Sequence, residues 1–409
     1  MKVAILGLGA RGMMHSKIAR SAGHTIEAVC DVQKERLVIA QNQLGVKKEN
    51  CFLKADDFFA AGKLADIIVI STLDETHYDY TLRALTLGYD ILLEKPIALK
   101  QNEIEEIAET AKRLNRKIGV CHVLRYTPFY QKIKELIDSG VIGKVMNINQ
   151  TENVGYYHYA HSFVRGNWHN SEETCPMILA KCCHDLDLIL WLTGKHCVKL
   201  SSFGSLDYFT SANQPNGAAD RCKDCKARDN CVFNAYQIYT DRPTWVKQPD
   251  GEDYTVENAI KQLDKNENFY GKCVFRTDNN VVDHQMVNLV LEDNVLAHLT
   301  MQAFSGEVYR RTQVCGTLGE INGVMEENRI TLHLFGKEPQ TFEIECDDGL
   351  SQHSGGDKLL FLDFLDCVEK DDKECKAEID CAVESHLLAF AAEKSRLQNG
   401  ETIVLRKEK

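Results

Sequence analysis

The sequence lacks an excess of basic residues: its 60 acidic residues outnumber its 48 lysines and arginines, which gives a formal net charge of −12. This balance argues against a nucleic acid or an acidic membrane as a partner, because both bind basic surfaces. No apolar run approaches the length of a membrane span, and the first one, residues 3–7, is too short for the core of a signal peptide. Internal repeats and low-complexity segments are also missing. We therefore expect a cytoplasmic globular protein of two or three domains.

The N-terminal segment has the pattern of a dinucleotide-binding domain. A continuous apolar strand, residues 2–7, leads into the loop Gly7-Leu8-Gly9-Ala10-Arg11-Gly12 and a helix-like run to Ala22. The first glycine permits a tight turn, the second lets the backbone approach a pyrophosphate, and the third lets the helix pack closely on the strand. The amides at the start of the helix suit the phosphates. This order of elements predicts dinucleotide binding.

The second strand, residues 25–30, ends at Asp31. An acidic residue at this spacing binds the adenosine ribose and disfavours a 2′-phosphate. The sequence therefore favours NAD over NADP, with Lys34 and Arg36 keeping NADP as an alternative.

Strands and helices continue to alternate after Asp31. Strands are expected at residues 66–71, 90–93 and 117–122, with helices at 76–88 and 102–114. This alternation predicts a doubly wound parallel sheet, whose ligands lie beyond the carboxyl ends of the strands. Four polar residues fall at or just after those ends: Thr72, His77, Lys95 and His122.

The stretch from Lys181 to Asp187 combines a lysine, a histidine, acidic residues and a cysteine pair. It opens an apolar run with helical spacing that stops at Gly194. On one helix, Lys181, His184 and Asp187 would share a broad face. The alternative is a helix cap or a buried polar pair without chemistry.

Sixteen cysteines are many for this length, and without an export signal metal or thiol chemistry is more common than disulfides. Cys222, Cys225 and Cys231 form a C-x2-C-x5-C motif in a polar loop. A closed zinc site needs a fourth ligand, for which Cys182 or Cys183 is the candidate. The motif favours structural zinc, with an iron–sulfur cluster or free thiols as alternatives.

The C-terminal part begins with a long insertion at about residues 204–251, of a size typical of lids and binding loops. Strands are expected again from residue 281, and a long helix at about 380–399. The polar loop around His353 and Asp357 suits sugar binding, or else Asp357 caps a helix.

These motifs together resemble the Gfo/Idh/MocA family of glucose–fructose oxidoreductases and inositol dehydrogenases. The matching residues are the glycine loop, Thr72-x-x-x-x-His77, Glu94-Lys95-Pro96-Ile97-Ala98, Arg125-Tyr126-x-Pro128, residues 140–145, residues 163–168, His184-x-x-Asp187 and residues 391–395. The resemblance covers nearly the whole chain.

The resemblance implies a Rossmann domain at residues 1–123 and an α/β domain at residues 124–409. The second domain would hold a large, mainly antiparallel, open-faced sheet that makes a homo-oligomer, a dimer or tetramer, and a final helix that packs back on the Rossmann domain. Lys95 and His184 would be catalytic. The implied cofactor contacts are Gly7, Leu8, Gly9, Ala10, Arg11, Gly12, Asp31, Thr72, His77, Glu94, Lys95, Arg165 and Trp168. The candidate substrate residues are Arg125, Tyr126, Lys181, Asp187 and His353.

One position departs from the family pattern. Many of its dehydrogenases carry an aspartate four residues before the histidine, where this chain has Ala180 followed by Lys181. Asp185 or Asp187 would then hold the histidine, or Lys181 would enter the site.

The main hypothesis is an NAD-dependent oxidoreductase acting on a secondary hydroxyl of a sugar, polyol or glycoside, with His184 as general base and Lys95 as electrostatic partner. The alternative is a redox-neutral glycoside hydrolase that oxidises the sugar ring transiently. A non-catalytic NAD-binding sensor is a minor third hypothesis.

Overall fold

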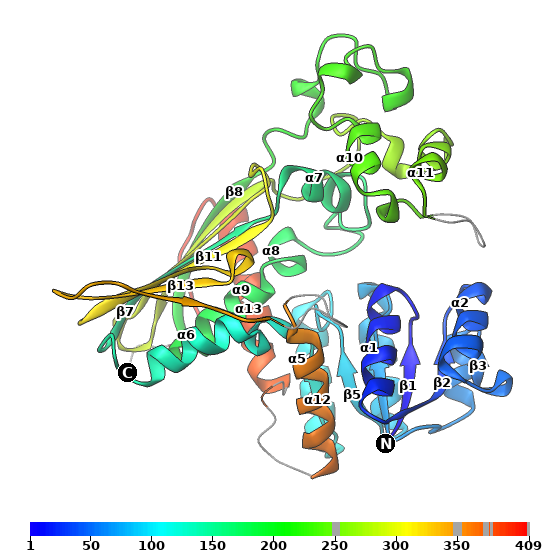
Figure 1. The fold of residues 1–409 in the computed structure, drawn as a ribbon, viewed down its shortest axis with the longest axis horizontal. Helices are drawn as coiled ribbons and strands as arrows, with labels where there is room; N and C mark the ends of the chain where they lie inside the picture. The colour runs from blue at the N-terminus through cyan, green and yellow to red at the C-terminus, as the bar shows by residue number, and fades with distance from the viewer. Residues whose placement is uncertain (248–253, 347–353, 371–375, 377–378, 407–409) are drawn as a thin grey trace.

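The computed structural model describes residues 1–247, 254–346, 354–370, 376 and 379–406. Its N-terminal domain is built on a six-stranded parallel sheet in the order β3-β2-β1-β4-β5-β6. The strands are β1 (Lys2–Leu6), β2 (Thr25–Cys30), β3 (Cys51–Phe52), β4 (Ile67–Ile70), β5 (Asp90–Leu93) and β6 (Ile118–Val120). Apart from the edge strand β3, their apolar residues are buried because helices cover both faces of the sheet (Figure 1). Those helices are α1 (Ala10–Ser21), α2 (Lys34–Ile39), α3 (Ala55–Ala60), α4 (His77–Thr86) and α5 (Gln101–Arg113).

The second domain is built on a nine-stranded sheet in the order β14-β13-β12-β11-β7-β10-β9-β8-β15. Only β7 and β10 pair in parallel among its neighbouring strands. The strands are β7 (Val145–Asn153), β8 (Cys197–Ser205), β9 (His284–Leu291), β10 (Leu296–Gln302), β11 (Tyr309–Gly316), β12 (Gly319–Val324), β13 (Arg329–Leu334), β14 (Gln340–Glu343) and β15 (Ile403–Val404). The predicted fold class, a Rossmann sheet followed by a large, mainly antiparallel sheet, is confirmed.

The helices of the second domain are α6 (Pro128–Asp138), α7 (Tyr156–Tyr159), α8 (Met177–Ala180), α9 (Cys183–Thr193), α10 (Ala235–Asp241), α11 (Val256–Leu263), α12 (Gly356–Glu369) and α13 (Ile379–Leu397). Several of them, α6, α9 and α13 among these, pack on one face of the nine-stranded sheet (Figure 1). α13 packs on α9 and β8 and also on α5 and β6, while α12 packs on α1. The last two long helices therefore tie the two domains together.

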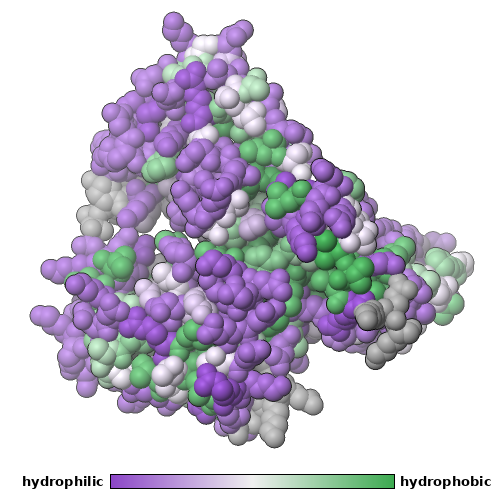
Figure 2. Space-filling view, turned by 180° about the vertical axis from the view of Figure 1, so that it is seen from behind, coloured by the Kyte–Doolittle hydropathy of each residue, from purple (hydrophilic) through white to green (hydrophobic). Residues whose placement is uncertain are grey.

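The segment between β8 and β9 carries α10, α11 and several short turns, and it stands beyond the carboxyl edge of the Rossmann sheet (Figure 1). Figure 2 shows a notch between this insertion, at the top, and the Rossmann domain, at the lower left. Among the described residues, no helix is both long and apolar enough to span a membrane.

Candidate active site

The glycine loop forms a cradle that fits a pyrophosphate. Gly7 has φ +92°, and a Cβ there would lie 2.6 Å from the Ser71 carbonyl oxygen. A Cβ on Gly12 would lie 1.9 Å from the Gly7 carbonyl oxygen, so α1 could not approach the loop. At Gly9, by contrast, the nearest atom is Arg36 Nη1 at 3.8 Å. The backbone is therefore open to a ligand at Gly9 and closely packed at the other two positions.

Asp31 lies at the end of β2, where its side chain is 6% exposed. Its Oδ2 accepts a hydrogen bond from the Leu8 amide at 2.7 Å, and Oδ1 accepts one from the Gln33 amide at 2.8 Å. Arg36 forms an ion pair with the same carboxylate, with Nη1 3.1 Å from Oδ2. The carboxylate thus braces the glycine loop and holds Arg36 beside Gly9.

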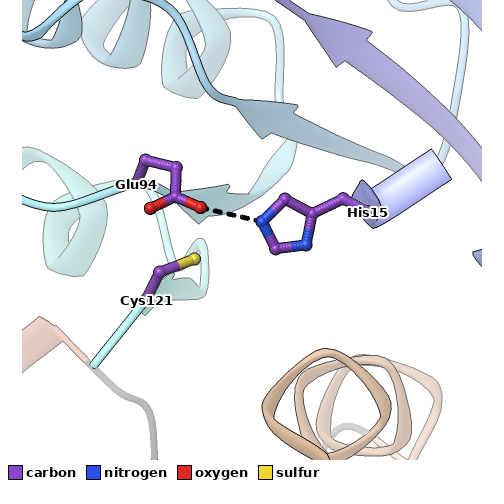
Figure 3. Close-up of side chains that lie close together, drawn as sticks. All are labelled: His15, Glu94 and Cys121. Atoms are coloured by element: carbon purple, nitrogen blue, oxygen red, sulfur yellow. Dashed lines mark hydrogen bonds and ion pairs between the residues drawn. The ribbon is translucent and has the colours of Figure 1, made fainter. Parts of the chain in front are cut away.

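The side chains of Arg11 and Glu94 form ion pairs within the protein. Arg11 Nε lies 2.6 Å from Glu94 Oε1, and its Nη2 lies 2.7 Å from Asp357 Oδ1 at the start of α12. His15 Nε2 lies 2.9 Å from the same Glu94 oxygen, with Cys121 beside it (Figure 3). Burial alone would raise the pKa of Glu94, but Arg11 and His15 hold it well below its usual range.

This group has three possible metal ligands, His15, Glu94 and Cys121, within 4.8 Å of one another. However, the Arg11 guanidinium already neutralises the carboxylate, and burial raises the pKa of Cys121 well above its usual range. Because metals bind the thiolate rather than the thiol, the group acts as an ion-pair cluster. It fastens the end of β5 to α1 and α12.

Lys95 and His184 come from different domains and converge at the carboxyl end of β5. Lys95 Nζ donates a hydrogen bond of 2.9 Å to the carbonyl oxygen of Ala180, the last residue of α8. His184 lies in the first turn of α9 and is 7% exposed. The carbonyl that Lys95 contacts therefore belongs to the turn that leads into the histidine.

His122, which follows β6, packs edge-on against His184 with ring centroids 5.4 Å apart. Its other side meets His386 of α13 at 5.3 Å. Burial, Arg125 and Lys95 lower the pKa of His122 well below its usual range. Neither ring nitrogen of His122 has a hydrogen-bond partner within the described part of the chain. A neutral imidazole therefore fills the space behind His184.

The acidic residues around His184 have strong partners of their own. Asp187 forms a bidentate ion pair with Arg125, and both residues are buried. Asp185 lies on the opposite side, where Oδ1 is 3.2 Å from Arg310 Nε. Burial raises the pKa of both aspartates, whereas Arg310 and Arg125 oppose the rise. These ion pairs fix α9 to the segment that follows β6 and to β11 of the nine-stranded sheet.

Lys181 does not share a helix face with His184, so that prediction is wrong. α8 ends at Ala180 and α9 begins at Cys183, which leaves Lys181 in the break between them. Its Nζ lies 3.4 Å from Glu152 Oε1, in a buried cluster that includes Arg310. Attraction to a buried carboxylate on β7 explains why the side chain turns this way.

The remaining predicted cofactor residues differ in their contacts, and of the three described next only Trp168 bonds across the two domains. His77 is fully buried, and its ring nitrogens lie 2.7 Å from the Pro96 carbonyl oxygen and 3.3 Å from that of Thr72. Trp168 Nε1 donates a hydrogen bond of 2.8 Å to Asp74 of the Rossmann domain. Arg165 is 2% exposed and points into the insertion.

A cavity of about 660 Å³ opens beside Trp168. One wall is residues 73–75 of the Rossmann domain, a second is residues 165–169 with 173–174, and a third is Lys247 with residues 268–270 of the insertion. Its position at the domain junction, past the carboxyl end of β4, is where doubly wound sheets bind ligands.

Other predicted site residues lie elsewhere. The Tyr126 hydroxyl donates a hydrogen bond of 2.7 Å to Asp363 Oδ2 of α12. Asp357 is buried against Arg11. His353 lies outside the described residues.

The predicted metal ligands separate into two places. Cys222, Cys225 and Cys231 line a small cavity in the insertion together with Cys273. Cys182 and Cys183 are not in that lining and lie fully buried around the start of α9. Cys273, His386 and Asp74 were not singled out from the sequence, because no local spacing connects them to the motifs.

The open backbone at Gly9, the acidic residue at the end of β2 and the parallel sheet are the features of a dinucleotide-binding domain. Residues 1–122 match the model of the oxidoreductase family NAD-binding Rossmann fold, and residues 134–403 match the family's C-terminal alpha/beta domain. The chain belongs to the Gfo/Idh/MocA oxidoreductase family, as the motifs indicated.

Relatives and solved structures agree with this assignment. The putative oxidoreductase YteT of Bacillus subtilis is 24% identical over 73% of this chain and 72% of its own length. The inositol 2-dehydrogenase/D-chiro-inositol 3-dehydrogenase of Lactiplantibacillus plantarum is 27% identical over 49% of this chain, which spans about half (55%) of that enzyme.

Two crystal structures share the fold over 99% of this chain and 98% of theirs. An Agrobacterium radiobacter oxidoreductase in complex with NAD+, L-tartaric acid and magnesium has a TM-score of 0.71 at 14% identity. The scyllo-inositol dehydrogenase of Lactobacillus casei with NAD(H) and scyllo-inositol has a TM-score of 0.68 at 19% identity.

Proposed function

We propose that the protein is an NAD-dependent oxidoreductase that acts on a secondary hydroxyl of a polyol, sugar or glycoside. The observation that carries this proposal is the contact between Lys95 Nζ and the Ala180 carbonyl oxygen at 2.9 Å, which brings a lysine of the NAD-binding domain to the turn that precedes His184. Inositol dehydrogenases among the relatives support a cyclic polyol or sugar as the substrate class.

In this proposal NAD+, when bound, supplies the hydride acceptor, and the protein moves the proton. His184 takes the hydroxyl proton, because an imidazole titrates near neutral pH. The Lys95 ammonium stabilises the developing alkoxide. His122 packs against the His184 ring and limits its rotation. Asp31 selects NAD over NADP by facing the adenosine ribose.

The candidate substrate residues divide by their contacts. Arg125 and Asp187 neutralise one another in a buried pair, and Tyr126 contacts α12. We therefore assign these three a positioning role around α9. Lys181 retains partial exposure, at 18% of its side chain, and is the candidate for direct contact with a substrate hydroxyl.

The test is NADH formation with inositols, sugars and glycosides. Lys95→Ala and His184→Ala should each lower kcat/KM by about a hundredfold or more. Lys100→Ala is the matched control, because that side chain is exposed and pairs with Glu103 on α5. Unchanged turnover in Lys95→Ala would refute the proposal. Release of aglycone without net NADH would replace it by the redox-neutral hydrolase.

We also propose that the uncovered face of the nine-stranded sheet joins subunits into a dimer or tetramer. Phe203 and Met286 pair across β8 and β9, and with Leu296 of β10 they expose 57%, 47% and 50% of their surface. Such apolar side chains on neighbouring strands suit a protein partner. Met286→Glu should shift the sedimentation coefficient toward that of a monomer, whereas a wild-type monomer would refute this proposal.

A further inference from the structure

Four cysteines of the insertion line one small cavity, and we call them the cysteine cluster: Cys222, Cys225, Cys231 and Cys273. Two short turns carry Cys222, Cys225 and Cys231. In the first, the Cys225 amide donates a hydrogen bond to the Cys222 carbonyl oxygen, and in the second the Cys231 amide donates one to the Arg228 carbonyl oxygen. The fourth is brought in by the tertiary fold: Arg221 pairs with Lys272 in an isolated bridge, and the Cys273 amide bonds the Asp220 carbonyl oxygen at 2.9 Å.

All four members of the cysteine cluster are free thiols. All four line the same cavity, and Arg165 lines it with them. The cavity between them has room for one water-sized sphere, with a volume of about 10 Å³.

Arg165 provides an independent indication that an anion belongs there. Its side chain is 2% exposed, and its Nη2 lies 3.8 Å from Cys222 Sγ and 2.7 Å from the Phe233 carbonyl oxygen. Its Nε bonds the Lys272 carbonyl oxygen at 2.8 Å, and its buried Nη1 has no hydrogen-bond partner in the described part of the chain. The hydrogen bonds given for this buried guanidinium are to two carbonyl oxygens, the Cys222 sulfur and the Tyr239 hydroxyl. Because these neutral groups do not compensate its charge, the guanidinium needs a counter-charge.

We propose that the cysteine cluster binds one metal centre through four thiolates, either a zinc ion or an iron–sulfur cluster. Four thiolates around a divalent ion leave a net negative charge, part of which the Arg165 guanidinium offsets. The structure thereby assigns the fourth ligand to Cys273, in place of Cys182 or Cys183. A site closed by four protein sulfurs has no open coordination position, so its role is structural.

The centre would fix two walls of the cavity at the domain junction. From Arg165 the chain runs directly into Trp168, which contacts Asp74 of the Rossmann domain. On the other side, Phe269 and Tyr270 line the same cavity just ahead of Cys273. A metal centre at this point therefore holds the insertion against the cleft.

The distances between the four sulfur atoms distinguish a zinc site from an iron–sulfur cluster. Among the described residues, no three sulfurs of the cysteine cluster all lie within 4.8 Å of one another. In a tetrahedral zinc site with Zn–S bonds of about 2.3 Å, the sulfurs are about 3.8 Å apart. Zinc therefore requires the cysteine side chains to rotate inward, whereas a cluster of several iron and sulfide atoms spans a wider set of thiolates.

The experiment is metal analysis of the full-length protein purified without oxygen, both as isolated and after reconstitution with Zn²⁺ or with iron and sulfide. We expect either about one zinc per chain, or iron and acid-labile sulfide together with visible absorption. X-ray absorption at the metal edge should show four sulfur ligands, at about 2.3 Å for zinc. Absence of both metals before and after reconstitution would overturn the proposal.

Ligand identity is tested by Cys273→Ala, with Cys182→Ala and Cys183→Ala as matched variants. Cys273→Ala should lose the metal, and the other two should keep it. Loss of metal from Cys182→Ala or Cys183→Ala, with retention in Cys273→Ala, would refute the assignment. If Cys273→Ala does not fold, the count of four sulfurs in the wild-type protein and the metal content of the other two variants still decide the question.

Discussion

Replacing Gly9 by alanine should separate cofactor binding from folding. Gly9 has φ −63° and ψ −170°, a conformation that alanine adopts without strain. The new Cβ would lie 3.8 Å from Arg36 Nη1, an ordinary contact. We therefore expect the free energy of unfolding to change by no more than about 1 kcal/mol. The methyl group, however, occupies the space through which a pyrophosphate approaches the backbone. The Kd for NAD should rise at least about tenfold, or about 1.4 kcal/mol.

Gly12→Ala is the matched variant, because its Cβ would lie 1.9 Å from the Gly7 carbonyl oxygen, a contact that only a backbone shift can relieve. Overpacking of this kind should destabilise the protein by about 3 kcal/mol. Urea unfolding and titration calorimetry with NAD measure the two effects separately. Wild-type NAD affinity in Gly9→Ala, or equal loss of stability in both variants, would refute the assignment of the cradle.

Three further outcomes follow from the buried groups around the site. Asp187→Asn leaves the buried Arg125 charge unpaired and should lower the free energy of unfolding by about 3–5 kcal/mol, measured in urea; an unchanged midpoint would contradict the buried pair. Burial lowers the pKa of His161 to about 4 and that of His386 to about 3. Between these values and about pH 6.5, both imidazoles stay neutral in the folded state, whereas the same imidazoles bind protons in the unfolded chain. The free energy of unfolding should therefore fall as the pH drops below about 6.5, by up to about 1.4 kcal/mol per pH unit for each histidine. Urea unfolding at pH 7, 6 and 5.5 measures this decrease. Asp31→Ser should weaken NAD and improve NADP relative to it, as measured by the ratio of the two Kd values, because the nearby guanidinium loses its carboxylate partner.

The features that the sequence predicts well are those encoded over a few residues. The parallel strands follow from continuous apolar runs, and Gly7 and Gly12 follow from backbone contacts that admit no side chain. Gly194 ends α9 with φ +62°, as its position after the apolar run predicted. In each case a local steric rule determines the structure.

The break before α9 could not be predicted in this way. A helix lies on each side of Lys181 and Cys182, and the spacing of Lys181 from His184 fits one continuous helix. Its side chain instead reaches Glu152 on β7, a strand whose position is known only from the fold. A buried carboxylate outweighs the modest free energy of one helical turn, and helix periodicity carries no information about that carboxylate.

The position of Cys273 beside the motif could not be predicted from local sequence either, because the contact that brings it there joins distant segments of the chain. The C-x2-C-x5-C motif indicates three ligands and a missing fourth. The fourth ligand that we propose, Cys273, is brought to the motif by a bridge between Arg221 and Lys272 that no local pattern encodes. The three candidate ligands alone left the choice between Cys182 and Cys183 open. For the metal centre that we propose, the buried guanidinium of Arg165 favours Cys273 over both, because a charge in the core needs a counter-charge close to it. It lies against Cys222, within the insertion, and not beside α9. The residue that the family resemblance associates with the nicotinamide pocket therefore links the domain junction to the cysteine cluster.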